Sequence, residues 1–308
     1  MYDVLVAGEI NPDLILSAPD LKVEFGQVET LVEDSTLTIG SSSAIFACGA
    51  ARLGLRVAFI GMVGDDLFGR FMLQALHDRS VNTTNVCVNP SLKTGFSVIL
   101  NRGDDRAILT YSGAMSELQA EQIPNDLLLQ ARHLHIASYF LQTRLQPGLP
   151  DLLRRAHACG LKTSLDPNWD PSERWAGFEK LLPFIDVFFP NEAEAISLAH
   201  AQTCEEALDK LGKHCKLVAI KLGARGAIAR GGDCMVKASS PTVRVVDTVG
   251  AGDSFDAGFI YGYLQGWEIE RCLHLATTCG ALSIRNHGGT VGQPTLAEAQ
   301  AVGVDNGR

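Results

Sequence analysis

The chain has 308 residues, of which 46% are hydrophobic and 20% are charged, and its formal net charge is -9. This composition is typical of a globular protein with a sizeable core. The acidic balance argues against nucleic acid or an anionic membrane surface as a partner, because both need a basic face.

Cysteine and hydropathy patterns predict the compartment. Eight cysteines are scattered without a C-x-x-C pair, which disfavours a zinc or redox site and predicts buried thiols in a reducing environment. Met1 is followed by a strand-like segment, and no apolar run reaches the roughly 18 residues that span a bilayer. We therefore expect a cytoplasmic protein without membrane contact.

Strand-like and helical segments alternate along most of the chain. The predicted strands lack polar alternation, as in a parallel sheet covered on both faces. They are Val4–Gly8, Val57–Val63, Leu134–Ala137, Lys162–Leu165, Val187–Phe189 and Leu217–Lys221. The predicted helices are Ala44–Leu53, Leu67–Arg79, Leu149–Cys159 and Glu192–Ala199. This alternation predicts a layered α/β domain.

Two stretches interrupt this alternation. Leu14–Ile39 is rich in Val, Thr and Leu, and Thr94–Tyr111 alternates around a predicted hairpin turn at Arg102–Asp105. Both are predicted to be antiparallel β insertions outside the main sheet. Composition equally allows them to be edge strands of one mixed sheet.

The segment Val243–Phe255 is the best candidate for chemistry. A β-like run ends at Asp247, and a turn containing Gly250 and Gly252 leads to a helix. Because glycine has no Cβ, backbone amides there can approach an anion, and the helix N-terminus adds unpaired N–H groups. Asp253 follows, either as a general base for a hydroxyl that attacks a phosphate or as a helix cap. The loop alone favours neither role, and it matches neither the dinucleotide fingerprint nor the P-loop.

Asp247-Thr-Val-Gly-Ala-Gly-Asp253 resembles the C-terminal signature of the ribokinase-like (PfkB) carbohydrate kinases. Other segments resemble that family's motifs in the same order along nearly the whole chain. They are Gly8–Asp13, Gly40–Gly54, Gly61–Gly69, Asp166–Asn168, Asn191–Glu194 and Lys221–Gly226. The resemblance implies one domain over residues 1–308, with a three-layer α/β/α core, a mostly parallel sheet and a small β-sheet lid. The lid would consist of residues 14–39 and 94–111.

The resemblance also implies an ATP-dependent kinase of a small sugar, with ATP and Mg²⁺ bound. Asp253 would be the base, and Gly250, Ala251 and Gly252 the anion hole. The expected sugar-binding residues are Asn11, Asp13, Gly40, Ser41, Ser42, Ser43, Arg106, Asp166 and Asn168. The expected nucleotide-side residues are Asn191, Lys221, Gly223, Gly226 and Asn286. Glu194 would hold Mg²⁺ through water, and Asp247 would contribute to a monovalent-cation (K⁺) site.

Several of these residues have simpler interpretations. Asn191 and Glu194 could form only the solvated first turn of a helix, with Asn191 as its cap. Asp13 could be a turn aspartate. Arg106 could be an exposed hairpin arginine.

The chain departs from the family at the expected sugar site. Where members often have Gly-Gly-Lys-Gly-Ala-Asn, the segment Gly40–Ile45 has Ser42 in place of the lysine and Ile45 in place of the asparagine. The arginine typical of kinases for keto-deoxy sugar acids is replaced by Trp169. A small neutral sugar is therefore favoured over a sugar phosphate or a sugar acid, and ribose itself is disfavoured.

Two alternatives stay open. Trp169 or Trp175 could stack on a purine, which would make the chain a nucleoside kinase of the same family, or could be core residues. The chain could also be a non-catalytic sugar sensor, although the intact motifs around Asp253 and Glu194 argue against lost chemistry. Exposed β edges of the lid predict a homodimer through the lid.

Overall fold

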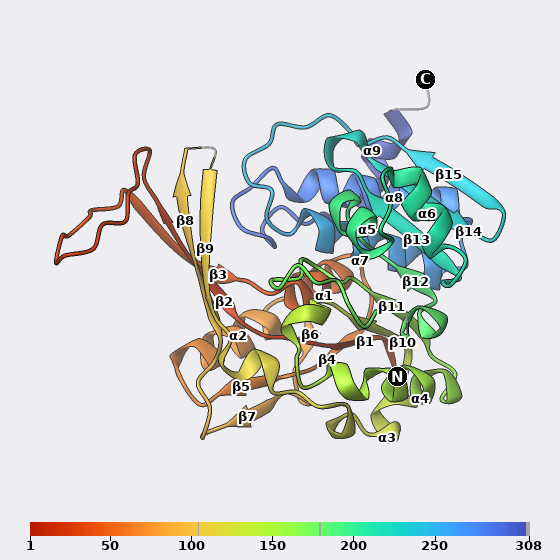
Figure 1. Cartoon of the computed structure of the whole chain (residues 1–308), viewed down its shortest axis with the longest axis horizontal. Helices are drawn as coiled ribbons and strands as arrows, with labels where there is room; N and C mark the ends of the chain where they lie inside the picture. The colour runs from red at the N-terminus through yellow and green to blue at the C-terminus, as the bar shows by residue number, and fades with distance from the viewer. Residues whose placement is uncertain (104, 179, 306–308) are drawn as a thin grey trace.

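The computed structural model describes residues 1–103, 105–178 and 180–305 (Figure 1). Asp104 of the predicted hairpin turn and the last three residues of the predicted domain lie outside the described residues. Within the described ranges, no helix is both long and apolar enough to cross a membrane.

A nine-stranded sheet forms the centre of the molecule, in the order β15-β14-β13-β12-β11-β10-β1-β4-β6. The strands from β13 to β6 are parallel to their neighbours, whereas β13, β14 and β15 pair antiparallel. The strands are β1 (Tyr2–Ala7), β4 (Val57–Ile60), β6 (Val81–Asn82), β10 (Ala131–Ile136), β11 (Lys162–Leu165), β12 (Val187–Phe188), β13 (Leu217–Lys221), β14 (Ala227–Gly231) and β15 (Cys234–Ala238).

Helices cover both faces of this sheet. One face carries α3 (Asn125–Leu128), α4 (Leu149–Ala158), α5 (Glu192–Leu198) and α6 (Cys204–Leu211). The other carries α1 (Ser42–Arg52), α2 (Leu67–His77), α7 (Ala251–Leu264), α8 (Ile269–Ser283) and α9 (Leu296–Asp305). In β1, Leu5 and Ala7 pack in the hydrophobic core under α3 to α6, whereas Val4 and Val6 pack in the core on the opposite face, under α1, α2 and α7 to α9. Burial on both faces explains the continuous apolar strands, and the predicted three-layer α/β/α core is confirmed.

The two interrupting stretches form a separate four-stranded sheet, in the order β3-β2-β8-β9. Its strands are β2 (Pro12–Ser17), β3 (Asp34–Ile39), β8 (Phe96–Arg102) and β9 (Asp105–Tyr111), and the structure therefore rejects the single mixed sheet. The pairing is not wholly antiparallel as predicted, because β2 and β8 run parallel. Figure 1 shows this sheet beside the core, with the strand-free segment 18–33 extending away from it.

Two further predictions about strands are wrong. The predicted strand Val57–Val63 is split at Gly61 into β4 and β5 (Met62–Gly64), and β5 pairs with β7 (Cys87–Asn89) in its own sheet. A Cβ on Gly61 would lie 2.6 Å from the Gly8 carbonyl, so the chain passes too close there for any side chain. The β-like run Val243–Asp247 is a loop: it pairs with no strand among the described residues, and its last two amides donate to the Ile284 carbonyl.

Candidate active site

A cavity of about 400 Å³, called here the first cavity, lies at the carboxyl ends of the parallel strands β11 to β13. Open α/β sheets bind ligands at this edge, because loops from neighbouring strands converge there. The first turn of α7, the start of α1 and the four-stranded sheet complete its wall. The predicted site residues that line it are Asp13, Ser41, Ser42, Arg106, Asp166, Asn168, Asn191, Glu194, Lys221, Gly223, Gly250, Ala251, Gly252 and Asp253.

Gly250 sets the geometry of the turn before α7. It is the N-cap with a φ of 74°, in the left-handed region. A Cβ on Gly250 would lie 2.7 Å from the Cα of Gly289 and 2.9 Å from the side chain of Ile45. Only glycine therefore fits this position, both for its conformation and for its packing.

The first turn of α7 presents unpaired donors to the first cavity. The N–H groups of Gly252 and Asp253 have no acceptor among the described residues. These N–H groups and the positive end of the helix dipole form a site for an anion.

Asp253 is the third residue of α7 and is only 7% exposed. Burial raises the pKa of its carboxyl to about 8; the negative charge of Asp166 acts in the same direction, and Lys221 opposes the shift. Asp253 makes no capping hydrogen bond, because Gly250 is the N-cap. The helix-cap alternative is therefore wrong.

Lys221, at the end of β13, is the centre of a buried charge cluster. Its Nζ lies 2.6 Å from Asp166 Oδ2 and 3.4 Å from Asp256 Oδ1, and both carboxylates are 1% exposed. Despite desolvation, these carboxylates raise the pKa of Lys221, which stays protonated. Burial keeps the pKa of Asp256 well above its usual range.

Asn191 and Glu194 form a capping box at the start of α5. Asn191 Oδ1 accepts from the Glu194 amide at 2.9 Å, and Glu194 Oε2 accepts from the Asn191 amide at 2.8 Å. Glu194 is 4% exposed, so the alternative of a solvated first turn is wrong. Burial raises its pKa to about 7, with a further contribution from Asp166. Its Oε1 atom has no partner in the described part of the chain, and such an oxygen suits Mg²⁺ that keeps its water shell.

Asp13 lies on β2 with its carboxylate toward the first cavity. Asn11 Nδ2 donates to Asp13 Oδ1 at 3.3 Å. Burial raises the pKa of Asp13 to about 7, a shift that Ser97 opposes by hydrogen bonding. A Cβ on Gly40 would collide with the Asp13 carboxylate. Asn11 and Gly40 thus hold Asp13 in place from behind and do not line the cavity themselves.

The turn before α1 is bound by a buried carboxylate that sequence analysis did not single out. Glu9 is 2% exposed. Its Oε1 accepts from the Ser43 amide at 3.2 Å and from Ser138 Oγ at 2.8 Å, and its Oε2 accepts from Ser43 Oγ at 2.5 Å. Ser41 Oγ donates to the Glu9 carbonyl at 2.6 Å. Ser43 therefore points into this network, away from the cavity.

Asn168 links this network to the cavity wall. Its Nδ2 donates to Ser42 Oγ at 2.6 Å and to Ser138 Oγ at 2.7 Å. Ser42 in turn hydrogen-bonds to Asp253 and thereby lowers the pKa of that carboxyl. Hydrogen bonds through Ser138 and Asn168 thus connect Glu9 with Ser42, which acts on the Asp253 carboxyl.

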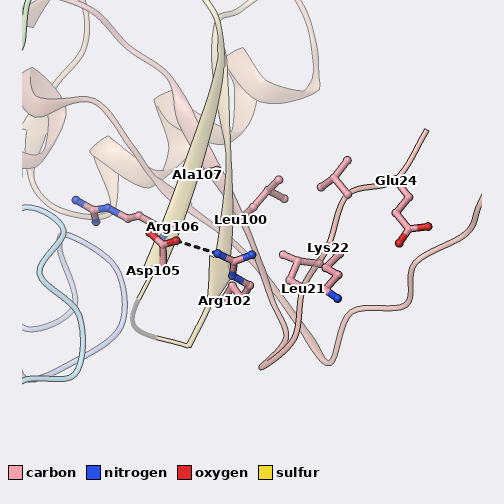
Figure 2. Close-up of a pocket in the computed structure, with 9 residues that line it drawn as sticks. Leu21, Lys22, Glu24, Leu100, Arg102, Asp105, Arg106 and Ala107 are labelled. Atoms are coloured by element: carbon pink, nitrogen blue, oxygen red, sulfur yellow. Dashed lines mark hydrogen bonds and ion pairs between the residues drawn. The ribbon is translucent and has the colours of Figure 1, made fainter.

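The four-stranded sheet contributes an apolar wall and one cation. Ile99 and Ile108 are paired in the β8–β9 register, so both side chains point to the same face, where they line the cavity. Figure 2 shows the Arg106 guanidinium on the side of the hairpin opposite Leu21 and Lys22. Arg106 also lines the cavity, and its guanidinium has no ion-pair partner among the described residues.

A second cavity of about 270 Å³ adjoins the first and shares Lys221, Gly223, Thr248, Ala251 and Gly252 with it. Its other walls are mainly small and apolar, formed by Ala224, Gly226, Ser240, Val245, Phe255, Thr277, Gly280, Ala281 and Ile284. The turn at Gly226 requires glycine, because φ is 91° and a Cβ would collide with the Ala238 carbonyl. Such an apolar slot suits a flat aromatic base.

The remaining predicted residues lie outside both cavities. Asp247 accepts from the amides of Val249 at 3.0 Å and Gly288 at 2.9 Å, and Asn286 is exposed in the loop before Gly288. Trp175 is buried in the core, and Trp169 contacts it edge-on at 5.0 Å.

Glu9, Ser138 and Asp256 are the site-forming residues that sequence analysis missed. Glu9 directly follows the first predicted strand, and Asp256 directly follows the candidate segment Val243–Phe255, in positions where a polar residue is expected to be exposed. For Glu9 and Asp256, the only signal in the sequence was an acidic residue inside an otherwise apolar segment, and such a signal does not identify the residue's partner.

The fold and this pair of adjoining cavities define an enzyme that transfers a phosphoryl group to a hydroxyl. A family model described as pfkB family carbohydrate kinase matches residues 1–296. The chain therefore belongs to the PfkB family of carbohydrate kinases.

Individual relatives agree with this assignment. A protein named as an uncharacterized sugar kinase from Archaeoglobus fulgidus is 33% identical over 250 residues, which cover 80% of this chain and 98% of the relative. The 2-dehydro-3-deoxygluconokinase of Bacillus subtilis is 32% identical over 290 residues, 88% of each chain. A protein proposed to be ribokinase II from E. coli, solved with ATP and Mg²⁺, superposes with a TM-score of 0.87 at 25% identity and covers 99% of this chain and 100% of that one.

Proposed function

We propose that this sugar kinase transfers the γ-phosphoryl group of ATP to a hydroxyl of a small neutral sugar, with Asp253 as general base. One observation carries the proposal: the buried Asp253 carboxylate lines the first cavity directly beside the unpaired amides of the α7 N-terminus. A carboxylate repels a phosphate bound beside it, and a role as the base that accepts the proton of the attacking hydroxyl explains its presence there.

In this proposal, phosphoryl transfer takes place in the first cavity, and the adenine binds in the second. Asp253 accepts the proton of the attacking hydroxyl, and the amides of Gly252 and its neighbours stabilise charge on the transferred group. Lys221 supplies a permanent positive charge between the cavities, and the apolar second cavity accommodates the adenine. When bound, Mg²⁺ neutralises phosphate charge, and Glu194 would hold it through water.

The sugar would lie in the first cavity between Asp13 and Asn168. Asp13 accepts from two hydroxyls, and Ser42 and Asn168 hydrogen-bond to a third. The four-stranded sheet would act as a lid of the same single domain, since Ile99 and Ile108 close one side of the cavity. Lid closure excludes water, which otherwise competes with the sugar as acceptor.

A monovalent cation is a further part of the proposal. Asp247 lies between the turn before α7 and the loop that contains Gly288 and Asn286. A K⁺ ion held by Asp247 and nearby carbonyls would stiffen the turn at Gly250. A rate that is unchanged when K⁺ is replaced by a large organic cation would contradict this role.

A sugar acid with a deoxy carbon is the second candidate substrate. The side chains of Ile45, Ile99 and Ile108 suit a carbon without a hydroxyl, and the unpaired Arg106 suits a carboxylate. The Bacillus subtilis relative is named as a kinase of such an acid. A purine nucleoside is less well supported, because neither Trp169 nor Trp175 lines the first cavity.

ATP consumption measured over neutral sugars, keto-deoxy sugar acids, sugar phosphates and nucleosides tests the proposed function. We expect the highest kcat/KM with a neutral sugar, and Arg106→Gln should change it little. If a sugar acid is preferred and Arg106→Gln abolishes that preference, the second candidate is correct. Tight sugar binding without turnover for any compound would indicate a sensor.

The pH profile of kcat/KM is expected to rise with pH. The folded-state pKa of Asp253 is about 8, so below this pH the base is protonated, and kcat/KM falls about tenfold per pH unit. Below about pH 7 the slope should steepen, because Asp13 also takes up a proton there. The measurement uses saturating ATP and Mg²⁺, and a flat profile between pH 6 and about 9 would contradict the base assignment.

We further propose a homodimer through the outer face of the lid. Alternate residues of β3 and β9 present apolar side chains to solvent there: Leu37 is 38%, Leu109 61% and Tyr111 47% exposed. Pairing with a second copy would cover them. Sedimentation analysis should show a dimer that Leu109→Asp converts to a monomer, and a monomeric unmodified protein would contradict this.

A further inference from the structure

A third cavity lies outside the site already described. It has a volume of about 540 Å³ and is a groove between the C-terminal ends of α1 and α2 and the loop Thr290–Gln293. It shares no lining residue with the first or the second cavity. Neither the fold nor the proposed kinase reaction requires it.

Two arginines line this groove: Arg52 is the last residue of α1, and Arg79 lies in the turn that follows α2. Arg79 is half-buried, yet its guanidinium has no hydrogen bond or ion pair with any residue that the structure describes. Within the described chain, Arg52 forms a single ion pair, with Glu298 at 4.0 Å, and both side chains are more than half exposed. Helix C-termini favour cations, but no carbonyl in the described chain accepts from either guanidinium. The Arg79 guanidinium is therefore free to bind an anion, and the Arg52 guanidinium is held only by a long, exposed ion pair.

Thr290 adds an unpaired donor. Its side chain is 6% exposed, and its Oγ1 atom is buried without any hydrogen-bond partner among the described residues. Leaving a buried hydroxyl unpaired is unfavourable, whereas a ligand oxygen would satisfy it. A hydroxyl beside two guanidiniums is a typical donor set for phosphate.

The opposite side of the groove offers acceptors. Gln293 is 5% exposed, and its Oε1 has no partner in the described chain. Asp78 uses one carboxylate oxygen to accept from Gln74 Nε2 at 2.7 Å and leaves the other free. A second anionic group would be repelled by Asp78, whereas hydroxyls could donate to both residues.

We propose that this groove is a second ligand site, which binds the phosphate group of a small phosphorylated polyol such as a sugar phosphate. Arg52, Arg79 and Thr290 bind the phosphate, and Asp78 and Gln293 accept from the hydroxyls. The site is regulatory, because Gln293 connects it with the catalytic elements. Its Nε2 donates to the Ile45 carbonyl of α1 at 2.9 Å and to Ser254 Oγ of α7 at 3.1 Å. Ser254 follows Asp253 directly, and Ile45 contributes to the first cavity.

Calorimetric titration of the full chain tests the site, with an ATP analogue and Mg²⁺ present to fill the α7 anion site. The probes are inorganic phosphate and glucose 6-phosphate. We expect both to bind, glucose 6-phosphate more tightly, and Arg79→Gln to weaken both about tenfold or more. Arg154→Gln is the matched control, because Arg154 is an exposed arginine paired with Asp151 on α4. Equal affinities for inorganic phosphate and glucose 6-phosphate would show that the site binds free phosphate and does not recognise the polyol. Absence of binding, or unchanged binding by Arg79→Gln, would overturn the proposal.

Thr290→Val separates binding from a structural role. Because the hydroxyl is unpaired without ligand, the valine variant should have an equal or higher Tm, yet bind both probes more weakly. A lower Tm without ligand would show that Thr290 Oγ1 serves the fold alone and would remove it from the site. In kinetics, glucose 6-phosphate should change the KM for the sugar in the unmodified protein by more than in Arg79→Gln. Identical responses would overturn the regulatory role.

Discussion

Replacing Asp253 with asparagine is expected to lower kcat by about 10²–10⁴-fold, the usual contribution of a general base. Asparagine keeps the volume of the side chain but cannot accept the proton of the attacking hydroxyl. Because the replacement removes a buried charge whose pKa is raised to about 8, the fold should be at least as stable above that pH. Steady-state kinetics and calorimetric binding of ATP and sugar measure the two effects separately.

Asp209→Asn provides the matched control, because Asp209 is an exposed aspartate that pairs with Arg230 on the surface. Its kcat should equal that of the unmodified protein. An Asp253→Asn variant with more than about a tenth of the normal rate would contradict general-base action. Loss of ATP binding together with the rate would instead indicate a role for Asp253 in positioning the nucleotide.

Replacing Lys221 with methionine is expected to reduce the free energy of unfolding by about 3–5 kcal/mol at neutral pH. The change leaves the buried carboxylates of Asp166 and Asp256 without their cation. Methionine conserves most of the volume, so the loss reports the charge and not a cavity. Activity should fall as well, because the pKa of Asp253 rises when Lys221 no longer opposes its shift.

The loss should depend on pH. Burial holds the folded-state pKa of Asp256 above its unfolded value, and without Lys221 nothing opposes this shift, so stability falls as pH rises and is partly restored as pH falls. Urea unfolding at about pH 6 and 8 measures this difference. Lys210→Met is the control: Lys210 pairs with Glu206 at 2.8 Å with both side chains over 40% exposed, so a change of about 0.5 kcal/mol or less is expected. Equal losses in the two variants would refute the buried-cluster interpretation.

Local patterns predicted much of the fold. Strands β11 and β13 begin and end where the sequence indicated, because each contains a run of consecutive buried residues, three in β11 and four in β13, with a lysine at one end. The helices α1, α2, α4 and α5 were located within two residues at each end. By contrast, α6, α8, α9 and the β14–β15 hairpin were not predicted. The antiparallel pairing of β8 with β9 was predicted, whereas the parallel pairing of β2 with β8 was not, since it joins segments about 80 residues apart.

In the candidate site, too, local features were predicted from the sequence, whereas features that depend on distant contacts were not. The Gly250–Asp253 motif indicated phosphoryl transfer because its requirements are local: a left-handed turn, free amides and a carboxylate within four residues. Asp253 could cap the helix only if the helix began later in the chain. The packing of Gly250 against Gly289 and Ile45 decided that Gly250 is the N-cap, and this packing exists only in the folded structure.

The sequence by itself determined the class of reaction and the order of the layers, since both depend on short-range patterns of glycine, charge and apolar residues. Only the tertiary structure decided how Glu9 binds Ser43 and Ser138, how Lys221 neutralises Asp166 and Asp256, and that Arg79 and Thr290 meet in a separate groove. These contacts join residues 30 to over 200 positions apart. Their energies depend on burial and distance, which exist only once the chain has folded.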